Sequence, residues 1–162
     1  AETASGEYPL EAVQMMSKVI LRVENGPDYQ TQLDVSRPKA EATVSDAISC
    51  AIRRISNVLP VAVLVNYSES GASSLRASRE RPKAPILNLT PNLQTARRLS
   101  VAWGIHSVVN DRLRQVDEVC STALEIAQAQ GMAERGDTLL ITAGVPFGQP
   151  GSTNSLRIET LI

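Results

Sequence analysis

The chain has 162 residues, of which 43% are hydrophobic and 20% charged, the balance of one ordinary soluble domain. Sixteen Lys and Arg residues against 17 Asp and Glu residues give a formal net charge of −1, which excludes the positive field that duplex nucleic acid requires. No apolar run approaches the roughly 20 residues of a membrane span, so we expect neither a nucleic-acid nor a membrane partner.

The cysteines and the first residues indicate where the protein works. Cys50 and Cys120 each lie in an apolar helical pattern rather than a paired, loop-rich framework, which predicts buried reduced thiols and a cytoplasmic location. The N-terminus lacks the basic and then apolar order of a signal peptide. Because the sequence begins at Ala1 without Met, we expect it to be part of a longer protein.

The first predicted element is a helix that begins near Pro9, where apolar residues start to recur at spacings of three and four. These residues are Leu10, Val13, Met16, Val19, Ile20 and Val23. The sequence NGPDYQ, 25–30, ends this helix. Residues 31–42 follow neither the helical nor the strand period. We therefore divide the chain into a helical segment, 1–24, a linker, 25–38, and one domain, 39–162.

Within that domain, predicted helices and strands alternate. The predicted helices begin after a cap at Ser45, span 72–81, open at Thr90-Pro91 and span 116–130. The predicted strands are 61–65, 85–89, 105–109, 138–144 and 155–161. The strand VAVLV, 61–65, is continuously apolar, whereas 155–161 strictly alternates apolar and polar residues, as an edge strand does.

This alternation predicts the fold. Strands separated by helices of about ten to fifteen residues indicate a parallel sheet with right-handed crossovers. We therefore expect an α/β fold with a five-stranded, mostly parallel sheet and helices on both faces. The strands 61–65 and 138–144 should lie in its centre, and the C-terminal strand should form an antiparallel edge.

Two loops rich in Gly, Ser and Thr follow the two central strands. Ligands of such sheets bind at the carboxyl ends of the strands where the winding direction reverses, so the loops 67–74 and 144–154 should meet. Gly71 precedes a helix, so amides from about Gly71 to Ser74 would face an anion. Additional donors are the hydroxyls of Ser68, Ser70, Ser73, Ser152 and Thr153. Composition alone leaves two interpretations open, a phosphate cradle and ordinary turns with helix caps.

Other kinds of site have less support. The sequence YSESGA lacks the Gly-x-Ser-x-Gly order of a nucleophile elbow, and the single histidine, His106, begins another strand. One His and two separated Cys offer no metal-ligand spacing. An unrelated flavodoxin-like protein would need an aromatic side chain to stack on a flavin, for which Tyr67 is the candidate beside the loop. We expect no catalytic residue and no metal site here.

Three ordered motifs resemble the C-terminal regulatory domain of pyruvate kinase. The sequence ETASGEYPLEAVQMM, 2–16, is similar to the family's Gly-Glu-Thr-Ala segment and the last helix of its catalytic barrel. The sequences SESGASS, 68–74, and RERPKAPILNL, 79–89, with the helix that ends before Trp103, are similar to the effector loop and the elements after it. The sequence 136–161 is similar to the closing strands, including their Gly-Ser-Thr-Asn loop.

The resemblance implies a parent enzyme of glycolysis, a cytoplasmic transferase that moves phosphate from phosphoenolpyruvate to ADP, giving pyruvate and ATP, with Mg²⁺ and K⁺. Its active site lies in the barrel, so this chain should itself be inactive. In the family, the C-terminal domain holds a phosphorylated allosteric effector and assembles into homotetramers. The resemblance carries effector phosphate binding over to Ser68, Ser70, Gly71, Ser73, Ser74, Gly151, Ser152 and Thr153. With its barrel absent, the apolar helix at 10–23 should make this chain self-associate.

Two departures from the family narrow the choice of effector. Members activated by fructose 1,6-bisphosphate usually have a Lys or another noncarboxylate after the loop's first Ser or Thr, and an Arg in the last loop. This chain has Glu69 and the Arg-free VPFGQPG there. A carboxylate within ~6 Å of a phosphate, at an effective dielectric of ~20, opposes binding by about 2 to 3 kcal/mol. We therefore expect ribose 5-phosphate, glucose 6-phosphate or AMP rather than the bisphosphate. The alternative is an assembly-only domain without an effector.

Overall fold

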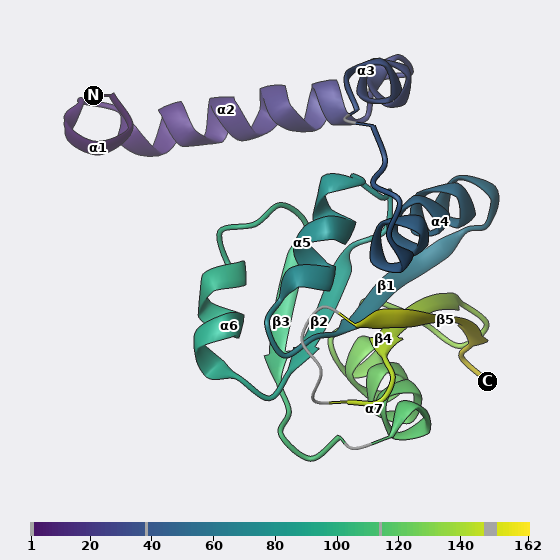
Figure 1. Cartoon of the computed structure of the whole chain (residues 1–162). Coiled ribbons are helices and arrows are strands. Elements are labelled where there is room, and N and C mark those ends of the chain that lie inside the picture. Colours follow the sequence, from purple (N-terminus) through teal and green to yellow (C-terminus); the bar gives the residue numbers. More distant parts are fainter. Residues whose placement is uncertain (1, 38, 114, 148–151) are drawn as a thin grey trace. The chain divides into compact units, whose positions relative to one another are not determined.

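The computed structural model describes residues 2–37, 39–113, 115–147 and 152–162 (Figure 1). They form two compact units, residues 1–39 and 40–162. The first unit contains α1 (Glu2–Ser5), α2 (Pro9–Glu24) and α3 (Tyr29–Ser36). The second contains α4 (Val44–Val58), β1 (Val61–Tyr67), α5 (Ala72–Arg79), β2 (Ile86–Thr90), α6 (Leu93–Leu99), β3 (Ile105–Val109), α7 (Val116–Ala129), β4 (Thr138–Gly144) and β5 (Thr153–Thr160).

The first unit contains the helix predicted from Pro9 and two short helices, α1 and α3, that the sequence did not predict. Pro9 occupies the first turn of α2, and the amide and side chain of Asn25 close its last turn by donating to the Leu21 carbonyl at 3.1 and 2.8 Å. Helix α3 lies within the predicted linker. Its residues carry no apolar stripe, so hydrophobic periodicity could not reveal it.

The second unit is the predicted α/β fold. Its sheet has the order β3-β2-β1-β4-β5 (Figure 1). Strands β1, β2, β3 and β4 run parallel, and β5 pairs antiparallel with β4. The predicted cap of α4 was wrong by two residues, because Thr43 adopts the extended backbone of a cap and its hydroxyl accepts from the Asp46 amide at 3.2 Å.

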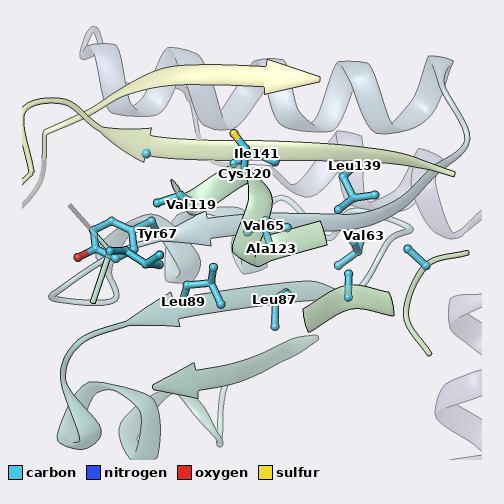
Figure 2. Packing of buried hydrophobic residues seen from close by; sticks show 14 of the residues in the cluster. Val63, Val65, Tyr67, Leu87, Leu89, Val119, Cys120, Ala123, Leu139 and Ile141 are labelled. Atoms are coloured by element: carbon cyan, nitrogen blue, oxygen red, sulfur yellow. The ribbon is translucent and has the colours of Figure 1, made fainter. Parts of the chain in front are cut away.

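Helices cover both faces of this sheet. On one face, Val65 of β1, Leu87 of β2 and Ile141 of β4 pack in one cluster with the α7 side chains Val119 and Ala123 (Figure 2). On the other face, Leu64, Ile86 and Leu140 pack against Ile52 of α4 and Ala77 of α5. Cys120 of α7 is buried in the cluster between this helix and the sheet, and burial raises the pKa of its thiol. Cys50 of α4 was also expected to be buried but is only half-buried.

A partly buried ion pair joins α4 to α5. Asp46, 1% exposed, accepts from the Arg79 guanidinium with one carboxylate oxygen and from the Glu41 amide with the other, at 2.7 Å. Arg79 also contacts the buried carboxylate of Glu80 at 3.2 Å. The hydrogen bond from Arg79 and then that from the Glu41 amide hold the pKa of Asp46 below its ordinary value near 3.8.

Candidate functional site

The two predicted loops meet at the point where the winding of the sheet reverses. The chain proceeds from β1 through β2 to β3 on one side and places β4 and β5 on the other, so the carboxyl ends of β1 and β4 lie side by side. The hydroxyls of Ser73 and Thr153 are hydrogen-bonded to each other across the two loops. The ring of Tyr67, at the end of β1 (Figure 2), stacks on Phe147 with centroids 4.6 Å apart.

The first loop uses some of the amides that we expected to be free. The Ser68 hydroxyl accepts from the Gly71 amide at 3.0 Å, and the Ser70 hydroxyl accepts from the Ala72 amide at 3.4 Å. Short serine side chains readily satisfy nearby backbone groups in this way. No acceptor for the amides of Ser73 and Ser74 is found in the described part of the chain. These two amides, in the first turn of α5, are therefore the ones that can face an anion.

The hydroxyls differ in what they can still do. Ser68 keeps its own proton to donate, because its bond to Gly71 uses only the oxygen. In the pair of Ser73 and Thr153, one hydroxyl donates and the other retains a free proton. Ser74 instead donates to the buried Asn88 side chain at 2.8 Å, which anchors α5 to β2 and leaves only its amide for a ligand.

The second loop is closed at its base by close backbone approaches. A Cβ on Gly144 would lie 2.4 Å from the Ser152 hydroxyl oxygen, so only glycine lets the returning chain pass there. The Asn154 side chain accepts from the Val145 amide at 2.9 Å and donates to the Val145 carbonyl at 2.6 Å. Ser152 and Thr153 thus lie beside the carboxyl end of β4. Gly151, also predicted to bind phosphate, lies outside the described residues.

Helix α6 fixes the first loop from the side that faces away from β4. Gly71 has a φ of +80°, and a Cβ there would lie 3.1 Å from both Thr95 and Leu99. The Thr95 hydroxyl donates to the Glu69 carbonyl at 2.9 Å, and Arg98 donates to the Ser70 carbonyl at 2.6 Å. Sequence analysis missed these α6 residues. The signal was available, because α6 follows β2, the parallel neighbour of β1, and so starts at the same end of the sheet.

A row of buried polar side chains crosses the sheet next to the loops. Asn66 lies in register with Thr142 of β4 and Asn88 of β2, and Asn88 with Ser107 of β3. The Thr142 hydroxyl donates to the side-chain oxygen Oδ1 of Asn66, and the side-chain nitrogen Nδ2 of Asn88 donates to the Ser107 hydroxyl at 3.3 Å. The amide nitrogen of Asn66 is buried and has no partner among the described residues. This end of the sheet is therefore polar beneath α5, although the strands are otherwise apolar.

The single histidine lies away from the two loops. His106 lies on β3, and β2 separates that strand from β1 and its loop, so the structure does not bring His106 to Ser68 or Ser70. Among the described residues, no group of three or more His, Cys, Asp and Glu side chains could hold a metal ion. In the same part of the chain, no helix has both the length and the apolarity that crossing a membrane requires.

Comparison with known proteins gives concordant matches along the chain. A family model described as pyruvate kinase, alpha/beta domain, matches residues 46–159. The pyruvate kinase of Methylorubrum extorquens is 40% identical over 158 residues, which are 98% of this chain and 33% of that protein. Those of Geobacillus stearothermophilus and Clostridium acetobutylicum are 34% and 32% identical over 160 residues, or 99% of this chain. The chain spans 27% and 34% of these two relatives.

Proposed function

This chain belongs to the family described as pyruvate kinase, alpha/beta domain, and we propose on that basis that it is the regulatory and assembly domain of a pyruvate kinase. The parent would be a cytoplasmic transferase of glycolysis that moves phosphate from phosphoenolpyruvate to ADP with Mg²⁺ and K⁺. In this proposal, catalysis belongs to the part of the relatives that the chain does not span. Residues 1–24 correspond to the last helix of their catalytic barrel.

The regulatory role is the binding of a phosphorylated effector between loops 67–74 and 144–154. The observation that carries this proposal is the hydrogen bond between Ser73 and Thr153, which unites the two loops beside the free amides of Ser73 and Ser74. Backbone amides and hydroxyls at a helix N-terminus are suited to phosphate, because the helix dipole and the N–H groups point at the same place. The effector is a sugar monophosphate or AMP, since Glu69 opposes the larger charge of a bisphosphate.

A thermal-shift panel tests this role. Ribose 5-phosphate, glucose 6-phosphate or AMP should raise the melting temperature, and fructose 1,6-bisphosphate should not. An effector at about a hundred times its Kd stabilises the folded state by about 2.7 kcal/mol, or roughly 5 to 10 °C for a domain of this size. Ser70→Asp should abolish the shift by adding charge to the loop, whereas Ser121→Asp, on exposed α7 surface, should preserve it.

The panel also separates the alternatives. If no phosphate ester shifts the melting temperature, the domain serves assembly only and its loops are ordinary turns. Micromolar binding of fructose 1,6-bisphosphate in titration calorimetry would overturn the preference for monophosphates while leaving the effector site in place.

We also propose that the domain assembles with copies of itself, as part of a homotetramer. Helix α2 supports this, because Leu10, Val13, Met16 and Ile20 are each at least half exposed along one stripe. In light scattering, the chain should form oligomers that dissociate on Ile20→Glu. Gln14→Glu, which adds the same charge to a polar position, should leave them intact. A monomeric chain with α2 helical would contradict the proposal.

A further inference from the structure

Arg98 of α6 brings a positive charge to the candidate site, whose two loops contain no cation among their described residues. We propose that Arg98 is the positively charged partner of the bound phosphoryl group and the residue that makes the site select phosphate esters over uncharged sugars and nucleosides. This inference rests on the proposed effector site. Its first support is the bond from the Arg98 guanidinium to the Ser70 carbonyl, at 2.6 Å.

The position of Arg98 is fixed by its neighbours on α6. Thr95 and Leu99, four residues apart, share the face of α6 that meets the loop, and the exposed Arg98 follows Thr95 at a spacing of three, at the edge of that face. Thr95 is bonded to the Glu69 carbonyl, and the fully buried Leu99 packs against Gly71. Helix α6 therefore packs on the loop through residues before and after Arg98 in the sequence. These contacts fix the backbone from which the Arg98 side chain extends.

The guanidinium still has donors to offer. Arginine carries five N–H groups, and the bond to Ser70 uses one of them. No other side-chain hydrogen bond or ion pair joins the Arg98 guanidinium to a residue of the described chain. Hydrogen bonds from guanidinium to phosphate are shorter and roughly twice as strong as neutral ones, so a phosphoryl oxygen competes well for this side chain.

The two loops provide no other cation among their described residues. Residues 67–74, 144–147 and 152–154 contain neither Lys nor Arg. Arg76, the next cation along α5, is near enough to Asp46 to help lower the pKa of that carboxyl. Arg98 thus supplies one positive charge to a site that the free amides of α5 complete. This arrangement fits one phosphoryl group better than two.

Titration calorimetry on the whole chain tests the inference with glucose 6-phosphate, ribose 5-phosphate, AMP and inorganic phosphate as probes. For each probe that binds the unmodified chain, Arg98→Gln should weaken binding about tenfold, the loss expected when a charge-assisted hydrogen bond is removed. The affinity of the Arg98→Lys variant should lie between those of the unmodified chain and of Arg98→Gln, because lysine keeps the charge but not the planar set of donors. Arg97→Gln removes a guanidinium that makes no hydrogen bond or ion pair with the described residues, so it should change affinity less than about twofold and provides the control for net charge.

The outcomes are distinguishable. If no probe binds the unmodified chain, the proposed effector site fails and the inference with it. If a probe binds equally well to the Arg98→Gln variant, the site stands and the role of Arg98 is overturned. It is also overturned if Arg98→Lys is as weak as Arg98→Gln, since charge would then not matter. Should Arg98→Gln not fold, Arg98→Met, which keeps the apolar stem, replaces it in the same comparison.

Discussion

Truncation of Leu64 to Ala should lower the free energy of unfolding by about 2 to 5 kcal/mol, the largest effect that we expect of any single change. Leu64 is fully buried in the middle of β1, between Ile86 of β2 and Leu140 of β4, and under Ile52 of α4. Removal of its branched end leaves a cavity that strands on both sides prevent from collapsing.

Denaturant unfolding followed by fluorescence measures this loss, because the single tryptophan, Trp103, reports on the second unit. The matched control is Leu75→Ala on α5, whose side chain is 47% exposed. It should change stability by less than about 0.5 kcal/mol, as surface substitutions usually do. Equal losses at the two positions would contradict the assignment of Leu64 to the core.

Replacement of Asp46 by Asn should destabilise the chain by about 2 to 3 kcal/mol, less than the loss of a fully buried pair because Arg79 is 40% exposed. Both carboxylate oxygens of Asp46 accept from donors, one from Arg79 and the other from the Glu41 amide. An amide side chain has one acceptor oxygen, so its NH₂ group must meet one of these donors. Asp117→Asn, at a carboxylate 86% exposed, should have little effect.

The same pair predicts a dependence on pH. The pKa of Asp46 is lowered in the folded state by the hydrogen bond from Arg79 and that from the Glu41 amide. A depressed carboxyl pKa contributes stability above the unfolded pKa, near 3.8, and that contribution disappears as the pH falls through the lower folded value. The difference in unfolding free energy between the unmodified chain and Asp46→Asn should therefore be constant near neutrality and shrink below about pH 4. A difference that grows on acidification would exclude this origin.

The fold could be predicted because its signals are local and repeated. Apolar strands such as 61–65 and 138–144 alternate with helices, and this alternation alone indicates a parallel sheet. The failures occur where tertiary contacts override or replace the pattern. Helix α3 was missed because it has no apolar face. The cap of α4 is Thr43 rather than the predicted Ser45. The polar row of Asn66, Asn88 and Thr142 was not predicted either: the first strand was ended at residue 65, one residue before Asn66, and the pairing of the three side chains depends on the register between strands.

The meeting of the two loops could be predicted, but the contacts within them could not. The winding rule alone brings loops 67–74 and 144–154 together, and it uses only the order of strands. It does not say which amides stay free, because the Gly71 amide is taken by a serine hydroxyl three residues before it. Nor does it identify Arg98, which reaches Ser70 across 28 residues of sequence through the docking of another helix. Contacts of this kind depend on side-chain geometry, which spacing along the chain does not encode.

The antiparallel return of β5 along β4 has a consequence for how relatives can diverge. It pairs Gly144 with Thr153, and the side chain of Asn154 holds Val145 beside the start of β5. A connection tied at its base can change length and composition without disturbing the register of the sheet. Relatives can therefore differ between these two strands while the sheet beneath stays the same.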